Sequence, residues 1–367
     1  MSQLQHHTRT SPLPTAADPD GLRRAAQRFW RWCPPSPLHR APALDAFVGC
    51  ETWVKCEHLL PTGAFKIRGA YHLLAEFARH GIRGEIVAAS RGNHGQALAR
   101  ACREHGRRCT IFVPFGNSAL KDRRMRALGA RVVMWGDTFD EAARGARAYT
   151  LAHAATAHLV NPGDTPSLVH GNAAMGLELA HQLEHMDLVD VDAVVAPVGV
   201  GSCAAALGLG LRTAGWSWPL VGAQSDRAPA MHDAWHHGRS TPRTAGHTVA
   251  DGLAVGEPPA YTSALLRELL DGFKLVDEDA IVAAMGAFRD AWGAADDDHP
   301  QRLGLARLHG VVEGAGATAL ACARDLVRAR PEFSRVVVVA SGANVDPTLN
   351  LTRHPALNPD RTRRHRR

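Results

Sequence analysis

The chain has 367 residues, of which 45% are hydrophobic and 21% are charged, and its formal net charge is +6. This composition is ordinary for a globular protein, and the length allows about two domains with a large core. No apolar stretch approaches the roughly 18–20 residues that span a bilayer, and residues 1–20 are too polar for a secretory signal. We therefore expect a soluble, cytoplasmic protein with no membrane partner.

The positive charge does not indicate a nucleic-acid partner, and the cysteines do not indicate disulfides or a zinc site. Five basic residues lie among the last seven: Arg361, Arg363, Arg364, Arg366 and Arg367. Such a basic chain end is usually solvated, and the rest of the chain is close to neutral, so we expect no nucleic-acid partner. The seven cysteines are scattered, with no Cys-x-x-Cys pair. We therefore expect neither a disulfide framework nor a zinc site.

Along the chain, apolar runs typical of strands alternate with amphipathic runs typical of helices. The expected strands cover residues 52–56, 85–89, 109–113, 131–135, 193–197, 220–224 and 335–340. The expected helices cover residues 22–32, 67–79, 95–105, 118–128, 140–152, 173–184 and 315–329. Several strands are continuous Val, Ile and Ala runs, as in parallel sheets that are buried on both faces. The alternation predicts an α/β fold with parallel sheets.

Two segments in the first third of the chain precede helices, where α/β proteins place ligands. Residues 61–69, Pro-Thr-Gly-Ala-Phe-Lys-Ile-Arg-Gly, place Lys66 after a glycine turn and beside Phe65. A lysine desolvated there is a competent amine for a Schiff base, although a surface lysine at a helix start explains this segment alone. Residues 90–96, Ser-Arg-Gly-Asn-His-Gly-Gln, offer backbone N–H groups and Asn93 to an anion. An ordinary turn before a helix explains this second segment equally well.

Two further segments follow strands nearer the C-terminus. Residues 198–203, Val-Gly-Val-Gly-Ser-Cys, put glycines between a strand and a helix, where N–H groups and the helix dipole bind phosphate. This segment lacks the Gly-Lys-Ser/Thr of a P-loop and the third glycine of a dinucleotide fingerprint, which disfavours a nicotinamide oxidoreductase. Residues 341–344, Ser-Gly-Ala-Asn, place a hydroxyl at a strand end, where it can bond a ligand nitrogen.

In this order and spacing, the four segments resemble the threonine/serine dehydratase (ammonia-lyase) branch of the fold-type-II, tryptophan synthase β-like, pyridoxal-phosphate enzymes. The resemblance covers about residues 30–347, and the lysine and asparagine segments are highly specific as a pair. The chain departs from the family pattern with Gly-Val-Gly-Ser in place of four glycines, with Ala343 in place of a glycine, and with Gly314 in place of a proline. These departures remove no side chain that the chemistry needs.

The resemblance implies the cofactor pyridoxal 5′-phosphate and a small amino-acid substrate. The implied cofactor-binding residues are Lys66, Phe65, Asn93, Gly199, Val200, Gly201, Ser202 and Ser341. Among them, Lys66 would be catalytic, because it would hold the cofactor as a Schiff base and shuttle the α-proton. Ser341 would meet the pyridine nitrogen, and Asn93 the 3′-oxygen. The implied substrate-binding residues are Ser90, Arg91, Asn93 and His94.

The implied reaction is the dehydration of L-threonine and/or L-serine, or a related β-hydroxy amino acid, to a 2-oxo acid and ammonia. A hydroxyl at Ser341 makes the cofactor a weaker electron sink than a carboxylate would. β-Elimination tolerates this, because its leaving group departs quickly. Three other reactions of this fold stay open: β-replacement, threonine synthesis and the elimination of ammonia from diaminopropionate. A further alternative is that the chain binds pyridoxal phosphate without being a catalyst.

Arg91 is the most informative departure. In family members that racemise serine, a serine at this position acts as a second base. Arginine stays charged and cannot accept a proton, so we expect no racemase activity. The side chain either contacts an acidic substrate or has a solvent-facing or structural role, and we favour the latter.

Some relatives bind a divalent cation near residues 223–230. Because Gln224 and Ala230 stand at the ligand positions here, we predict no metal at this site, although Asp226 keeps the site open. The acidic cluster at 296–298 is expected to be a solvated loop.

The resemblance also implies two domains, each a largely parallel sheet covered by helices, with the cofactor in the cleft between them. We place the large cofactor-binding domain at residues 21–80 and 166–350, and the small domain at residues 81–165. The N-terminus, residues 1–20, and the basic tail, residues 351–367, are expected to be unordered. Closure of the small domain would exclude water from the site. A homodimer is expected from the family and from the frequency of two-fold oligomers.

Overall fold

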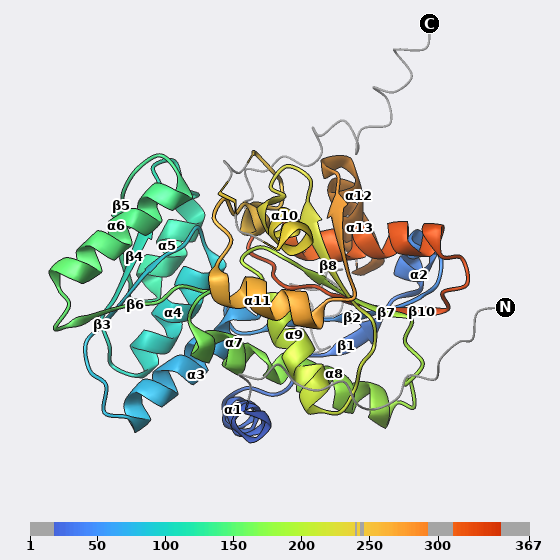
Figure 1. Cartoon of the computed structure of the whole chain (residues 1–367), viewed down its shortest axis with the longest axis horizontal. Coiled ribbons are helices and arrows are strands. Elements are labelled where there is room, and N and C mark those ends of the chain that lie inside the picture. The colour runs from blue at the N-terminus through green and yellow to red at the C-terminus, as the bar shows by residue number, and fades with distance from the viewer. Residues whose placement is uncertain (1–17, 239–240, 243–245, 293–310, 346–367) are drawn as a thin grey trace, which may run out of the picture.

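The computed structural model describes residues 18–238, 241–242, 246–292 and 311–345. These residues form two α/β units, one around a six-stranded sheet and one around a four-stranded sheet (Figure 1). We call them the six-stranded unit and the four-stranded unit. The predicted α/β class with parallel sheets covered by helices is confirmed. The acidic cluster at 296–298 and the basic tail at 351–367 lie outside the described residues.

The six-stranded sheet has the strand order β1-β2-β10-β7-β8-β9. Its strands are β1 (Leu38–Arg40), β2 (Glu51–Lys55), β7 (Ala193–Pro197), β8 (Leu220–Ser225), β9 (Gly272–Val276) and β10 (Arg335–Val339). Neighbouring strands are parallel except for β1 and β2, which are antiparallel. Strand β10 lies between β2 and β7, and its run of four valines is typical of a strand buried on both faces.

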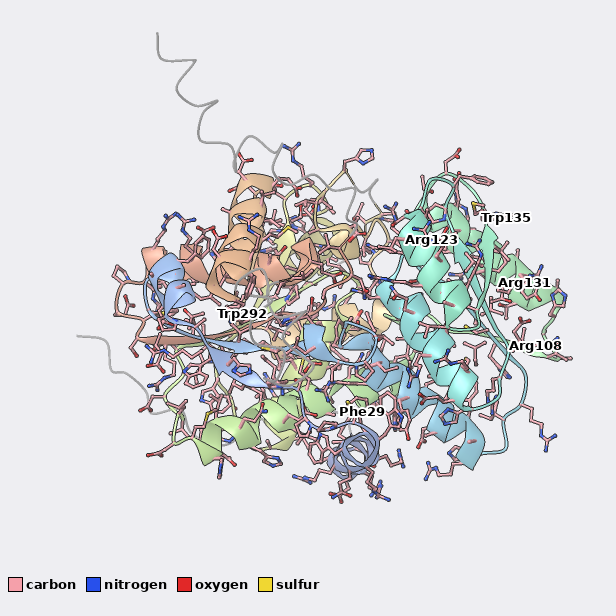
Figure 2. All side chains as sticks on the ribbon, turned by 180° about the vertical axis from the view of Figure 1, so that it is seen from behind. Phe29, Arg108, Arg123, Arg131, Trp135 and Trp292 are labelled. Carbon is pink, nitrogen blue, oxygen red and sulfur yellow. The ribbon has the colours of Figure 1, made fainter. Side chains whose placement is uncertain are left out.

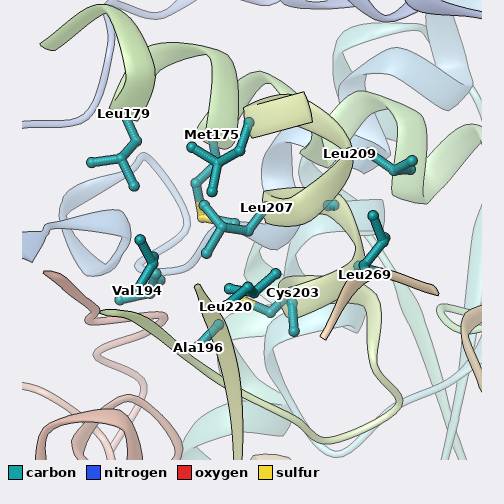
Figure 3. Packing of buried hydrophobic residues seen from close by; sticks show 14 of the residues in the cluster. Met175, Leu179, Val194, Ala196, Cys203, Leu207, Leu209, Leu220 and Leu269 are labelled. Atoms are coloured by element: carbon teal, nitrogen blue, oxygen red, sulfur yellow. The ribbon is translucent and has the colours of Figure 1, made fainter. Parts of the chain in front are cut away.

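Helices cover both faces of this sheet. One face packs against α8 (Ala174–His185), α9 (Ser202–Thr213) and α11 (Ala260–Leu269), and α1 (Pro19–Trp32) packs on α8. In this layer, Met175, Leu179 and Leu207 lie above the strand residues Val194 and Leu220 (Figure 3). The other face packs against α2 (Pro42–Val48), α12 (Glu278–Trp292) and α13 (Gly314–Ala329). The remaining elements are η1 (Glu57–Leu59), α7 (Pro166–Asn172), α10 (Ala230–His237) and η2 (Asp251–Leu253).

The four-stranded sheet has the order β5-β4-β3-β6 and is entirely parallel. Its strands are β3 (Glu85–Ala89), β4 (Cys109–Val113), β5 (Arg131–Met134) and β6 (Ala157–Leu159). Helices α3 (Lys66–Arg79), α4 (Asn93–Glu104) and α5 (Ala119–Ala127) cover one face, and α6 (Phe139–Ala152) covers the other. Seen from behind, Arg108, Arg123, Arg131 and Trp135 all project from this unit (Figure 2).

Helix α3 packs closely against α7 of the other unit. The contact depends on Gly69, because a Cβ there would lie 2.4 Å from the carbonyl oxygen of Leu168. Among the described residues, no helix is both long and apolar enough to cross a bilayer. All seven cysteines are free.

The predicted ranges match β3, β4 and β7 at both ends. Strands β1, β6 and β9 were not predicted; each has three to five residues and lies at a sheet edge, where burial imposes a weaker apolar pattern. Helix α1 begins at Pro19 rather than at Leu22, inside the segment predicted to be unordered. Its start is fixed because the Asp18 side chain accepts a hydrogen bond from Asp20 N at 3.1 Å, and because proline suits a first helical turn.

A buried ionic network anchors the start of α3. Arg68 is fully buried. Its Nε donates to Glu57 at 2.7 Å, and its Nη1 and Nη2 donate to the two carboxylate oxygens of Glu178 at 2.6 Å each. Lys55 donates to the same Glu178 carboxylate at 2.9 Å. Burial alone would raise the pKa of Glu178, but the charges of Arg68 and Lys55 outweigh it and hold that pKa well below its usual range. Strand β2, η1, α3 and α8 therefore meet at one charged cluster.

Replacing Arg68 by leucine would leave two buried carboxylates without their main partner. We expect the Arg68→Leu substitution to lower the free energy of unfolding by about 3–5 kcal/mol, measured by urea denaturation. Arg79→Leu on the same helix is the matched control: the Arg79 side chain is 60% exposed in its ion pair with Glu76, and exposed pairs contribute at most about 1 kcal/mol. A loss in Arg68→Leu no larger than that in the control would contradict the anchoring role.

Candidate active site

One cavity with a volume of about 120 Å³ lies between the two units. It opens at the carboxyl ends of β3, β7 and β10, the edge at which open α/β sheets bind ligands. The four sequence segments meet here. Its wall includes every residue that the sequence singled out for the site: Phe65, Lys66, Ser90, Arg91, Asn93, His94, Gly199, Val200, Gly201, Ser202 and Ser341.

Lys66 is the first residue of α3 and is held next to the end of β10. Phe65 N donates to the carbonyl oxygen of Ser341 at 3.2 Å. Lys66 Nζ donates to Ser202 Oγ at 2.6 Å and lies 4.7 Å from the centre of the Phe65 ring. Burial lowers the pKa of Lys66 to about 8. The neutral amine, which is the nucleophilic form, is therefore available near neutral pH.

The loop from Gly199 to Ser202 forms part of the cavity wall. A Cβ on Gly199 would lie 2.4 Å from the carbonyl oxygen of Gly252, so a side chain cannot be placed there. Gly201 has a φ of +84°, which also favours glycine. Ser202 begins α9, whose first N–H groups have no acceptor inside the helix. Backbone donors and a helix dipole at a cavity wall fit a phosphate group.

The turn after β3 is organised by the Ser90 side chain. Ser90 Oγ accepts hydrogen bonds from Gly92 N at 3.0 Å and Gly95 N at 2.9 Å. Helix α4 begins at Asn93, so the N–H groups of Asn93 and His94 belong to its first turn, where a helix provides no acceptor. Burial, followed by the charge of Lys66, lowers the pKa of His94 to about 3, so its ring is neutral. This turn fits a carboxylate.

A chain of hydrogen bonds joins the two units across the cavity. Asn93 Nδ2 donates to Glu313 Oε1 at 2.6 Å, and Asn344 Nδ2 donates to Asn93 Oδ1 at 2.7 Å. Asn344 N donates to the other oxygen of Glu313 at 3.1 Å. Burial, followed by the charge of Asp251, raises the pKa of Glu313 to about 7. Both ends of the Asn93 amide are therefore fixed in direction.

Three charged residues of the cavity wall were not predicted as site residues: Lys121, Asp251 and Glu313. Lys121 of α5 forms an ion pair with Asp251 of η2, which connects the two units a second time. Asp251 and Glu313 lie in the segments Ala-Asp-Gly and Glu-Gly-Ala-Gly, which also match the family, so a signal for them was present. Lys121 stands in a charged helix where nothing in the sequence distinguishes it.

The predicted absence of a metal site rested on residues near β8. Gln224 Oε1 accepts a hydrogen bond from His232 N at 3.0 Å. Within the described ranges, no group of three or more His, Cys, Asp or Glu side chains could hold a metal ion.

The fold and this cavity define an α/β protein with a buried lysine amine and two helix-start turns in one cleft. The sequence profile of the family described as pyridoxal-phosphate dependent enzyme matches residues 31–342. The chain belongs to this family and, as predicted, to its fold-type-II threonine/serine dehydratase branch. The lysine amine and the N–H groups at the start of α9, both at the cavity wall, fit the aldehyde and the phosphate of the cofactor.

Individual relatives agree with this assignment. The L-threonine ammonia-lyase of Thermotoga maritima is 31% identical over 85% of this chain and 72% of its own length. The catabolic L-threonine dehydratase TdcB of Escherichia coli K12 is 30% identical over 92% of this chain and 95% of its own length. The structure of maize serine racemase superimposes with a TM-score of 0.78 at 26% identity, covering 91% of this chain and 95% of that one. At the family level, the chain is a pyridoxal-phosphate-dependent lyase.

The lowered pKa of Lys66 predicts how fast the apoprotein takes up pyridoxal phosphate at different pH values. Only the neutral amine attacks the aldehyde, so the association rate should rise with pH and level off above about 8. The rate is followed by stopped-flow absorption, with Nα-acetyl-lysine as the reference for the ionisation of the cofactor itself. A rate that keeps rising through pH 10, as for an ordinary lysine with a pKa of about 10.4, would show that Lys66 is not desolvated.

Proposed function

We propose that the chain is an ammonia-lyase that converts L-threonine and/or L-serine, or a related β-hydroxy amino acid, to a 2-oxo acid and ammonia. The observation that carries this proposal is that the Lys66 amine, whose pKa burial lowers to about 8, lines one cavity with the turns at which α4 and α9 begin. One turn suits a phosphate and the other suits an amino-acid carboxylate. The names of the relatives from T. maritima and E. coli support the same substrate class.

We assign the cofactor as follows. Lys66 Nζ would hold it, and Phe65 would pack beside its ring. The loop of Gly199, Val200, Gly201 and Ser202 would bind its phosphate. Ser341, which is only 4% exposed after the end of β10, would meet the pyridine nitrogen. The Asn93 amide, oriented by Glu313 and Asn344, would meet the 3′-oxygen.

The substrate carboxylate is assigned to the turn that begins at Ser90. The N–H groups of Asn93 and His94 hold it, and a fixed carboxylate also orients the α-C–H bond towards Lys66. The cavity wall includes apolar side chains that limit the access of water: Phe65, Phe139, Leu253 and Val255.

When bound, the cofactor supplies an electron sink for the charge that develops as the α-proton leaves. Lys66 Nζ takes this proton, and its lowered pKa makes the required neutral form far more abundant than in an ordinary lysine. The β-hydroxyl then departs with a proton as water. The resulting enamine takes up water and releases ammonia. The homodimer, the cytoplasmic location and the domain boundaries at residues 80/81 and 165/166 stay predictions.

The direct test is an assay of 2-oxo acid and ammonia from L-threonine and L-serine. The purified protein should release both in equal amounts. Lys66→Ala should lose the cofactor absorption band and at least about 1,000-fold of the activity, because both attachment and proton transfer use this amine. Lys274→Ala, an exposed lysine on β9, is the matched control and should keep both.

Release of a different product, such as an amino acid formed by β-replacement, would select one of the other reactions of this fold. A protein that binds the cofactor but converts no β-substituted amino acid would contradict the proposed function.

A further inference from the structure

The cavity carries one positive charge that the proposed reaction does not use. The charged side chains in its wall are Lys66, Arg91, Lys121, Asp251 and Glu313. Lys121 is paired with Asp251, and Glu313 is hydrogen-bonded to Asn93 and Asn344. Lys66 is assigned to the cofactor. Arg91 is the charge that remains.

Arg91 is not neutralised by the part of the protein that the structure describes. Its guanidinium forms neither an ion pair nor a hydrogen bond with any described residue, and its Nε is buried without an acceptor. A buried donor without an acceptor is costly, and such a group calls for a ligand or a water as its partner. Because Arg91 lines the cavity wall, that partner is expected inside the cavity.

The acidic side chains nearby do not serve as this partner. The charges of Arg144 and, to a smaller extent, Arg91 act to lower the pKa of Asp140 at the start of α6. Burial, and then the charge of Glu257, raises the pKa of Asp140. Asp140 and Glu257 line an adjoining cavity of about 150 Å³, whose wall does not include Arg91. Arg91 therefore lines the space beside Lys66, whereas Asp140 and Glu257 line the neighbouring space.

The α-carboxylate of a substrate already has a binding site of its own. It is the first turn of α4, where the N–H groups of Asn93 and His94 have no acceptor in the helix. A guanidinium is suited to a further carboxylate, because its donors match both oxygens in a planar, bidentate pair. The arrangement thus offers separate sites to two carboxylates of one substrate.

We propose that the cavity prefers β-hydroxy amino acids with a second carboxylate, of the 3-hydroxyaspartate type, and that Arg91 binds this second carboxylate. This inference rests on the proposed function and narrows its substrate class. In 3-hydroxyaspartate the Cα–H and Cβ–O bonds break and water leaves. The enamine takes up water and releases ammonia, which gives oxaloacetate. The conversion needs no oxidant or reductant.

Binding is tested first, with two amino acids that lack a hydroxyl and differ by one carboxylate. L-Aspartate and L-alanine are titrated into the holoenzyme, and their dissociation constants are obtained from the change in the cofactor absorption spectrum. L-Aspartate should bind about 10- to 100-fold more tightly, as expected for a charge-assisted bidentate pair. Arg91→Gln should remove this preference, and Arg91→Lys should retain part of it, because lysine keeps the charge but not the planar fork.

The matched control is Arg144→Gln. It makes the same substitution at an arginine whose charge also acts on Asp140, but which lies outside the cavity wall, and it should retain the full preference for L-aspartate. In turnover, the kcat/KM ratio of 3-hydroxyaspartate to L-threonine should fall at least about tenfold in Arg91→Gln. The fall should arise mainly from KM for 3-hydroxyaspartate.

Two results would overturn the proposal. One is L-aspartate binding no more tightly than L-alanine to the wild-type protein. The other is an equal rise in the dissociation constants of L-aspartate and L-alanine in Arg91→Gln, which would assign Arg91 to the α-carboxylate. Failure of the proposed function is distinguishable, because it appears as the absence of oxo acid from every hydroxy amino acid, whereas the two dissociation constants are measured without turnover.

Discussion

The buried pairing of Arg68 with Glu57 and Glu178 holds the site together. Together with Lys55, it joins β2, η1 and α8 of the six-stranded unit to the first turn of α3, the helix that carries Lys66. Charges buried this deeply are expensive unless every partner is in place, so the cluster tolerates little displacement. Lys66 lies two residues before Arg68, and its backbone is fixed by the same helical turn. A nucleophile must be positioned within a fraction of an ångström, and this cluster provides that rigidity.

The two units share part of their apolar packing, since Phe29 of α1 and Leu168 of α7 belong to the core around the four-stranded sheet, but at the cavity they meet through polar contacts. The contacts at the cavity are Asn93 with Glu313 and Asn344, and Lys121 with Asp251. Polar contacts of this kind can be exchanged for water at much lower cost than buried apolar surface. At the cavity itself, the predicted closure of residues 81–165 over a substrate would therefore exchange these contacts at low cost. The same contacts reach the proposed ligand sites, because Asn93 belongs both to this chain and to the carboxylate-binding turn.

Much of the site was predictable because its residues are grouped in four short segments of the sequence. The segments around Lys66, Asn93, Gly199 and Ser341 each combine a strand or loop end with residues of defined chemistry, and all four reach one cavity. The fully buried strands were also predictable, because burial on both faces leaves a continuous apolar run. The edge strands β1, β6 and β9 are short or carry exposed polar residues, so that signal is weak.

Long-range charge pairing was not predictable. Lys121 pairs with Asp251 from a helix whose sequence is charged along its length, and Arg68 meets Glu178 from a segment 110 positions away. A single sequence holds no record of which charges meet. The place of Arg91 is a similar case: the sequence favoured solvent or a structural role, whereas its side chain lines the cavity.

The central claim is that Lys66 holds the cofactor, and reduction of the holoenzyme with borohydride tests it most directly. Reduction makes the bond between pyridoxal phosphate and its lysine permanent, and peptide mass spectrometry then identifies the modified residue. We expect one phosphopyridoxyl group, on the peptide that contains Lys66. Modification of Lys55, Lys121 or Lys274 instead, or of no lysine at all, would contradict it.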